Sequence, residues 1–181
     1  AGGIQCTLQY VMCDGYTHKT KYIPPIAPSP NLPNSTAIYL YPILCLTEGT
    51  VLSCGRGTDF PFQVVGHPKF KPKDFSFTPR SIEGASKNPT HKNILCYGTD
   101  LRTFPPKNIT RLPLEIFIDA YNNYEGSDPF FTPFMLKVAG TAELQKQIEQ
   151  GMSAQEIRNS WKKDLETFMK MRKKYLLYTD F

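Results

Sequence analysis

Two short segments of this 181-residue chain combine a restrained backbone with polar side chains suited to a polar ligand. The first, Pro28 to Asn34, contains three prolines, whose fixed φ leaves few conformations to lose when a ligand binds. The second, Gly55 to Phe62, places a guanidinium, a hydroxyl and a carboxylate within four residues. A guanidinium can grip a carboxylate with a fork of two hydrogen bonds, whereas hydroxyl and amide groups suit sugar hydroxyls. These segments supply four candidate substrate-binding residues: Ser29, Asn31, Arg56 and Thr58.

One pair of carboxylates, Glu48 and Asp59, is a candidate for catalysis. Glycoside hydrolysis uses two carboxyl groups, one as an acid and one as a base or nucleophile, at a fixed separation. Glu48 follows an apolar run and is expected to be partly buried, as proton donors in such sites often are. Two structural alternatives stay open. Glu48 can simply accept hydrogen bonds from the turn that follows it, and Arg56 can form a structural ion pair with Asp59.

Several classes of function lack support in the sequence. Gly55-Arg56-Gly57 does not continue into G-x-G-x-x-G, so we expect no nucleotide site. The three histidines and five cysteines lack ligand spacing, and we expect neither metal nor cofactor; the thiols are interpreted as buried and free, with one disulfide as the alternative. A net charge of +5 is too small to indicate nucleic acid, and no apolar run is long enough for a membrane span.

The elements that position these residues divide at the last proline, Pro133. We predict a single domain, with a strand-rich and loop-rich part at 1–111 and a helical part at 112–181. Alternation and apolar runs bounded by turn residues predict four strands. These are Ile4 to Tyr10, Ala37 to Leu46, Gln63 to Val65 and Ile94 to Tyr97, and residues 66–93 are predicted to form a surface loop.

The helical part carries clearer signals. Helices are predicted over Leu114 to Tyr124 and Thr141 to Gln150, and a third begins at a capping box formed by Ser153 and Glu156. Behind the box, an apolar stripe is expected to lie on a core. The stripe consists of Ile157, Trp161, Leu165 and Phe168. The predicted class is α+β, with α/β as the alternative: a mixed β-sheet with long proline-rich loops and a helical C-terminal section.

Several stretches of the chain, taken in order, resemble the C-terminal half of the bacterial exo-β-N-acetylmuramidase family. They are P-S-P-N-L-P at 28–33, L-Y-P-I-L-C-L-T-E-G-T at 40–50, S-C-G-R-G-T-D-F-P-F at 53–62, C-Y-G-T-D-L-R at 96–102 and the ending from Trp161 to Tyr178. The resemblance covers essentially the whole chain. Thr47 departs from it, since an aromatic residue is expected there.

The resemblance implies a function. Family members are glycoside hydrolases that remove terminal N-acetylmuramic acid from peptidoglycan fragments, and they are about twice as long as this chain. A Rossmann-like N-terminal half supplies their principal catalytic acid. This chain is therefore expected to be the C-terminal domain of a two-domain enzyme and one wall of the cleft. The ligand's lactyl carboxylate and hydroxyls would suit Arg56, Asn31 and Asp59.

The resemblance leaves a second function open and implies a compartment. The alternative is a non-catalytic module that binds peptidoglycan or docks another domain. Work on cell-wall fragments suggests the periplasm or the cell surface, although the chain opens on Ala1 without a signal pattern. We interpret the chain as a mature protein or a piece of a longer one.

Overall fold

The computed structural model describes residues 3, 5–105 and 109–178, and these divide into two compact units. Unit 1 comprises residues 1–23 and 161–181, and unit 2 comprises residues 24–160. Unit 2 holds every candidate site residue. No helix among the described residues combines the length and the apolar character needed to cross a bilayer.

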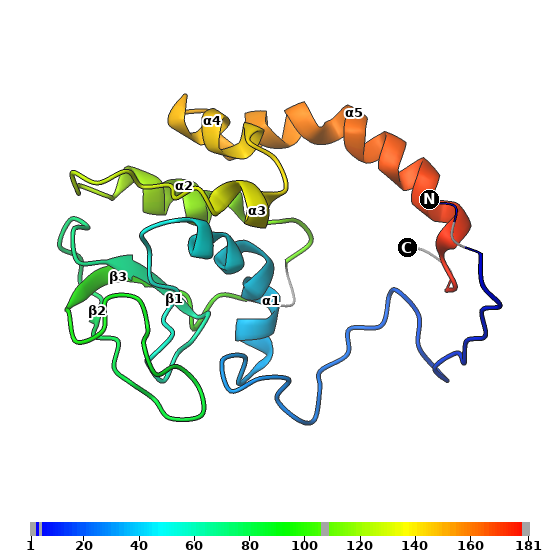
Figure 1. The fold of residues 1–181 in the computed structure, drawn as a ribbon, viewed down its shortest axis with the longest axis horizontal. Coiled ribbons are helices and arrows are strands. Elements are labelled where there is room, and N and C mark those ends of the chain that lie inside the picture. The colour runs from blue at the N-terminus through cyan, green and yellow to red at the C-terminus, as the bar shows by residue number, and fades with distance from the viewer. Residues whose placement is uncertain (1–2, 4, 106–108, 179–181) are drawn as a thin grey trace. The chain divides into compact units, whose positions relative to one another are not determined.

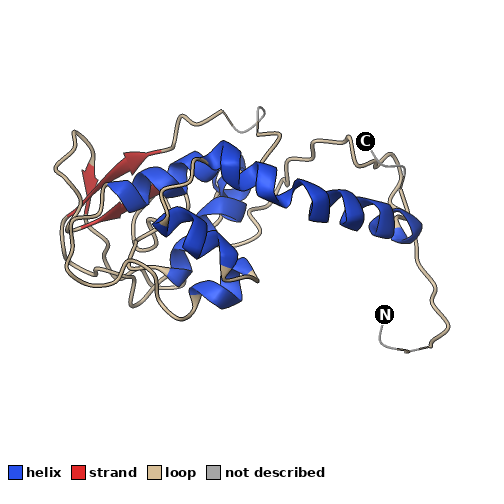
Figure 2. Cartoon of the chain, turned by 90° about the horizontal axis from the view of Figure 1, so that it is seen from above, coloured by secondary structure: helices blue, strands red, loops and turns tan. Residues whose placement is uncertain are grey.

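A small antiparallel sheet lies in unit 2. It contains β1 (Val64–His67), β2 (Ser76–Phe77) and β3 (Cys96–Asp100), in the order β1-β3-β2. Both pairings are antiparallel, and Gly66 lies opposite Gly98 in the register. Figures 1 and 2 show the three strands side by side. The α+β class is confirmed, and the sheet is antiparallel throughout rather than mixed in strand direction.

The predicted strand from Ala37 to Leu46 is wrong. The segment forms helix α1 (Ser35–Leu44), followed by the 3-10 helix η1 (Cys45–Gly49). Asn34 caps α1, because its side-chain oxygen accepts a hydrogen bond from the amide of Ala37 at 3.0 Å. The helix buries several apolar residues, so its apolar run reflects burial rather than a strand. These are Ala37, Leu40, Ile43 and Leu44.

The other short predictions are mostly confirmed. β1 and β3 correspond to the two short strands predicted at Gln63 and Ile94, with ends shifted by one to three residues. Residues 66–93 are not simply a surface loop, because they contain β2 and the buried side chains of His67, Phe70 and Phe77. These side chains are buried between the sheet and the segments around it, which local sequence alone does not indicate.

The helices of the second half follow the predictions closely. The described helices are α2 (Leu114–Asn122), α3 (Met135–Ala139), α4 (Glu143–Glu149), α5 (Ala154–Arg172) and η3 (Lys173–Tyr175). The capping box is confirmed: the Ser153 amide donates to Glu156 Oε2 at 2.8 Å, and the Glu156 amide donates to Ser153 Oγ at 3.3 Å. Helix α3 was not predicted; within unit 2 it packs against η1.

Two predictions fail in unit 1. Residues 5–10 are not in a described strand, and Ile4 lies outside the described residues. The apolar stripe of α5 does not lie on a core along its length: Ile157 is fully buried, but Leu165 and Phe168 are exposed. The periodicity is present in both segments, but within unit 1 their apolar side chains are exposed.

Candidate functional site

The strongest candidate for a site centres on Glu48 and Arg56. Arg56 Nη2 donates to Glu48 Oε1 at 3.0 Å. Both side chains line a pocket of about 80 Å³. Leu52 is the one large apolar residue of the lining, and the rest is polar or small: Thr47, Thr50, Ser53, Cys54 and Thr90. Two residues predicted separately, one for catalysis and one for substrate binding, are therefore brought together.

The 3-10 helix η1 positions Glu48. Thr47 Oγ1 donates to the carbonyl of Leu44 at 2.6 Å, and Thr50 Oγ1 donates to the carbonyl of Thr47 at 2.8 Å, so the backbone on both sides of Glu48 is held. The Glu48 side chain is exposed, contrary to the expectation of partial burial. Its carboxylate is held by an arginine rather than by the amides of the following turn, which replaces that alternative.

A tight turn presents Arg56. Gly57 has φ +80°, and a Cβ built on it would lie 2.5 Å from the carbonyl oxygen of Arg80. The Arg80 amide donates to the carbonyl of Gly57 at 2.7 Å, which explains this close approach. The guanidinium of Arg56 also lies 4.9 Å from the ring centroid of Phe62, a cation–π contact that restrains it. Only glycine fits this turn without movement of the neighbouring loop.

Asp59 is not at the pocket that Glu48 lines. Its carboxylate accepts a hydrogen bond from Arg80 Nη2 at 2.8 Å, and both side chains are exposed. The expected alternative, an ion pair between Arg56 and Asp59, is wrong, because Arg56 pairs with Glu48 instead. Each carboxylate of the candidate catalytic pair is thus held by its own arginine.

The remaining candidates are held by the backbone. Asn31 is buried, and its side-chain nitrogen donates to the carbonyl of Ala85 at 3.1 Å. Ser29 Oγ accepts from the Asn31 amide at 3.1 Å. Thr58 Oγ1 donates to the carbonyl of Gly55 at 2.7 Å and accepts from the Phe60 amide at 3.0 Å. These hydrogen bonds hold the loops in shape. Ser29, Asn31 and Thr58 do not line the pocket of Glu48 and Arg56, nor either of the two larger pockets of unit 2.

No sequence pattern predicted a role for the segment around residues 80–86. Arg80 bonds Gly57 and Asp59, while Ala85 bonds Asn31, so this segment ties the two candidate loops together. The side-chain hydrogen bond of 3.0 Å from Asn34 to Gln63 was not predicted either. The only signal was the presence of polar residues within a stretch of low periodicity. These hydrogen-bond partners are 21 to 54 residues apart in the sequence, so no local sequence pattern predicts their contact.

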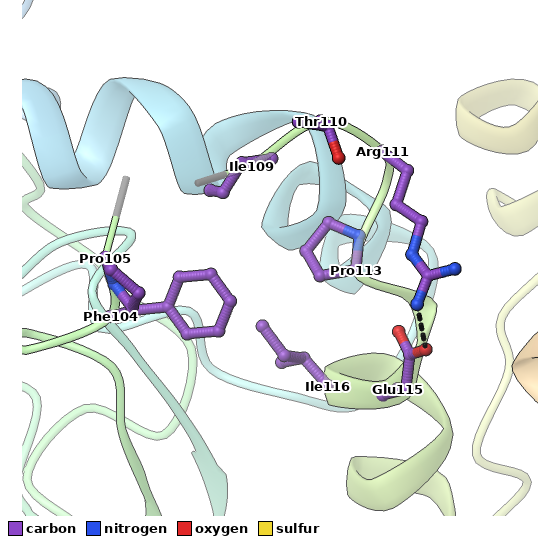
Figure 3. A pocket seen from close by; sticks show the side chains of 8 residues that line it. All are labelled: Phe104, Pro105, Ile109, Thr110, Arg111, Pro113, Glu115 and Ile116. Carbon is purple, nitrogen blue, oxygen red and sulfur yellow. Dashed lines mark ion pairs between the residues drawn. The ribbon is translucent and has the colours of Figure 1, made fainter. Parts of the chain in front are cut away.

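Two larger pockets lie in unit 2 away from the candidate residues. One of about 310 Å³ is lined by apolar side chains and by the ion pair of Arg111 with Glu115, at 3.7 Å; Figure 3 shows Phe104 and Ile116 facing one another across it. The other, of about 420 Å³, is lined by aromatic and polar residues that include Tyr124 and Asp128. Volume therefore does not select the site, and the chemistry of the lining residues favours Glu48 and Arg56.

The buried titratable groups of unit 2 are histidines and thiols. Burial, and then the neighbouring His91, lower the pKa of His67 to about 4; burial also lowers the pKa of His91. Burial raises the pKa of Cys96 to about 12 and raises the pKa of Cys54. All five cysteines are free; Cys54 and Cys96 are buried as predicted, whereas the exposed Cys6 and Cys13 contradict the expectation of burial. Groups of three or more histidine, cysteine, aspartate or glutamate residues arranged for a metal do not occur among the described residues.

Comparison with known proteins identifies the family of the chain. The family model for the C-terminal part of the exo-beta-N-acetylmuramidase NamZ matches residues 39–178. The chain belongs to the NamZ C-terminal family. The matched range includes Glu48, Arg56 and Asp59 but begins after Ser29 and Asn31. The family resemblance predicted from the sequence is therefore confirmed.

Two relatives of this family show how much of a longer protein the chain represents. The peptidoglycan beta-N-acetylmuramidase NamZ of Bacillus subtilis (strain 168) is 34% identical over an alignment of 169 residues, and the alignment covers 86% of this chain and 41% of that protein. A crystal structure of a DUF1343 family protein from Bacteroides fragilis matches with a TM-score of 0.87 and 51% identity, covering 93% of this chain and 48% of that one. The chain thus spans about half the length of the relatives it matches, or somewhat less.

Proposed function

We propose that this chain is part of an exo-acting glycoside hydrolase that removes non-reducing terminal N-acetylmuramic acid from peptidoglycan fragments. In this proposal it forms one wall of the active-site cleft, and the other half of the full-length enzyme supplies the principal catalytic acid. Membership of the NamZ C-terminal family supports the reaction class. We locate the substrate-contacting site of this chain at Glu48 and Arg56, because the two side chains form an ion pair and line the same pocket.

The chemistry of this pair suits the ligand. Arg56 uses one nitrogen of its guanidinium for Glu48, so its other N–H groups can bind the lactyl carboxylate of N-acetylmuramic acid. Glu48 uses Oε1 for Arg56, so Oε2 can accept a hydrogen bond from a sugar hydroxyl. We assign Arg56 to recognition of the lactyl group and Glu48 to contact with the sugar ring, with Asp59 as the second carboxylate of the cleft wall.

The first test compares sugars with and without the lactyl group. Hydrolysis of chromogenic β-glycosides of N-acetylmuramic acid and of N-acetylglucosamine is measured on the full-length enzyme. Arg56→Ala should raise KM for the first substrate at least tenfold and remove the preference for it over the second. Arg102→Ala, which breaks an ion pair with Asp100 at residues that do not line the pocket, is the matched control. An unchanged preference in Arg56→Ala would contradict the assignment.

A second test addresses the carboxylates. Glu48→Gln and Asp59→Asn are nearly isosteric, so each removes the charge with little change in packing. Loss of kcat by a factor of 100 or more in either variant would identify a carboxylate that acts in the chemical step. A rise in KM alone, at unchanged kcat, would assign that residue to binding. Unchanged kcat and KM in both variants would exclude these residues from the cleft.

A second candidate function, a module that binds peptidoglycan or docks a domain without catalysis, is favoured by one observation. Unit 1 exposes many large apolar side chains, among them Leu8, Tyr10 and Val11. This chain alone, and this chain mixed with the missing half, can be assayed for hydrolysis and for binding to peptidoglycan fragments. Binding without hydrolysis in the mixture would favour the module. Hydrolysis in the mixture would favour the enzyme.

The compartment is also part of the proposal. A substrate derived from the cell wall places the protein in the periplasm or at the cell surface. Fractionation of cells that express the full-length protein, with detection by antibody, tests this. Recovery only in the cytoplasmic fraction would contradict it.

A further inference from the structure

Residues 5–12 have the sequence of a strand but no partner strand among the described residues. The alternation of Cys6, Leu8 and Tyr10 with polar residues is that of a half-buried strand. All eight residues are exposed, and Leu8 and Val11 are 75% and 97% exposed. A half-buried pattern without a buried face indicates that the covering surface belongs to another part of the protein.

The exposed segment is anchored at its end. The amide of Cys13 donates to the hydroxyl of Tyr178 at 2.8 Å, and the rings of Tyr16 and Tyr178 meet edge to face at 4.9 Å. These contacts lie within unit 1 and fix the point where the segment leaves the C-terminal residues. The same unit exposes Leu165 and Phe168 of α5. Unit 1 therefore presents apolar side chains from both of its chain segments.

The segment also lacks the features that protect edge strands from pairing. Residues 5–12 contain no lysine, no other charged residue and no proline. Such a segment can add to the edge of a sheet, where main-chain hydrogen bonds give affinity and alternate side chains pack on the partner. The solved relative matches 93% of this chain with less than half of its own length, so a partner of comparable size is present in that protein.

We propose that residues 5–12 add as a strand to a sheet edge in the other half of the full-length protein, and that Leu165 and Phe168 pack on the same half. This inference rests on the proposed two-part enzyme and names the surface that joins the parts. The strand provides main-chain pairing, and the helix provides additional apolar contact. The occupant is the rest of the same polypeptide rather than a second copy of this chain.

Hydrogen exchange tests the strand directly. This 181-residue chain is measured alone and with a polypeptide comprising the part of the Bacteroides fragilis relative that lies outside the matched region. Addition of a strand should slow amide exchange in residues 5–12 at least tenfold in the mixture and leave it fast in the chain alone. If circular dichroism shows that the second polypeptide is unfolded by itself, the same exchange is measured in a single chain that joins the two. Fast exchange in residues 5–12 of a folded complex would overturn the proposal.

Substitutions test the side chains and the backbone separately. Leu8→Lys places a charge on the apolar face of the segment, and Leu8→Pro removes a backbone donor, so the affinity of the two halves should fall at least tenfold in each variant. The control is Ile26→Lys, because Ile26 is 80% exposed but belongs to unit 2. Circular dichroism melting should be unchanged in all three variants. Equal loss of affinity in the control would overturn the proposal.

Two further outcomes separate this inference from the enzyme. Concentration-dependent protection of residues 5–12 in the chain alone, with a doubled mass in sedimentation, would assign the surface to a second copy and overturn the proposal. Association of the two halves with protection of residues 5–12 but no hydrolysis would support the docking surface and contradict the hydrolase. The binding readouts need no turnover, so the two proposals fail independently.

Discussion

The two units of this chain place their aromatic residues in opposite environments. In unit 2, Phe117 is 1% exposed and its ring packs edge to face on Phe130. In unit 1, Phe168 is 50% exposed and lies on a helix whose exposed side also carries Leu165. Unit 2 builds a core from its own residues, whereas unit 1 leaves many of its large apolar side chains exposed.

The difference extends to polar groups. In unit 2 the loops that carry the candidate site are joined by specific bonds, such as Arg56 to Glu48, Arg80 to Asp59 and Asn31 to the carbonyl of Ala85. In unit 1 the anchoring contacts described above concentrate at Tyr178. A restrained loop network suits ligand recognition and an exposed apolar surface suits docking, so the roles that we propose for the two units can be tested separately.

The largest expected effect distinguishes the two environments of phenylalanine. Phe117→Ala should lower the free energy of unfolding by about 3–5 kcal/mol, because it leaves a cavity in a packed core. Phe168→Ala, the matched change in unit 1, should cost less than about 0.5 kcal/mol in the isolated chain. Urea unfolding followed by circular dichroism measures both. Similar losses would show that unit 1 has a core of its own and would break the comparison.

The next effect concerns two glycines with positive φ. Gly57→Ala should cost about 2–4 kcal/mol, because strain in the left-handed region adds to the clash with the carbonyl of Arg80. Gly15 in unit 1 has φ +67° but nothing within 4 Å of a built Cβ. Gly15→Ala should therefore cost only about 1 kcal/mol. Thermal unfolding of the two variants measures the difference in the free energy of unfolding. Equal losses of stability would mean that the backbone at Arg80 moves away from the added methyl group at little energetic cost.

The sequence was sufficient to predict elements whose signals are local. The capping box of Ser153 and Glu156 predicted the start of α5 correctly, because both partners lie within one turn. The segment from Ala37 to Leu46 failed because β-branched and aromatic residues on every side hid the helical spacing of Ala37, Leu40 and Leu44. The N-cap at Asn34 was a helix signal that outweighs the composition of this run.

The candidate site was predictable in residue type but not in pairing. Glu48 and Arg56 were both selected from their loops, yet the sequence favoured Asp59 as the partner of Arg56 because it is nearer along the chain. Arg80, the actual partner of Asp59, lies 21 residues further on. Pairings of this kind depend on how loops meet in space. For the same reason the half-buried strand predicted from Ile4 to Tyr10 is wrong for the described residues, because strand pairing needs a partner that the local alternation does not specify.

The pH dependence of stability probes the interior of unit 2. His67 has a pKa of about 4 in the folded chain against about 6.5 when unfolded. Between these values the unfolded chain binds a proton that the folded chain does not, so stability is full above pH 6.5 and falls as the pH drops toward 4. The loss should reach at most about 3 kcal/mol for this residue, and His91 adds to it with the same sign. Urea unfolding at pH 7, 5.5 and 4 should give a smaller pH slope for His67→Gln than for the wild type; an equal slope would contradict the burial of a neutral imidazole.

The smallest effect tests how finely the loops of unit 2 are joined. Asn34 makes two bonds of 3.0 Å: its oxygen caps α1 at the Ala37 amide, and its nitrogen donates to Gln63. Asn34→Ala removes both and should cost about 1–2 kcal/mol. Asn34→Asp keeps the capping oxygen and loses only the donor, so it should cost about 1 kcal/mol or less. Urea unfolding of the pair separates the two contributions. A cost in Asn34→Asp that equals the cost in Asn34→Ala would mean that the bond to Gln63, rather than the helix cap, accounts for the stabilisation by Asn34.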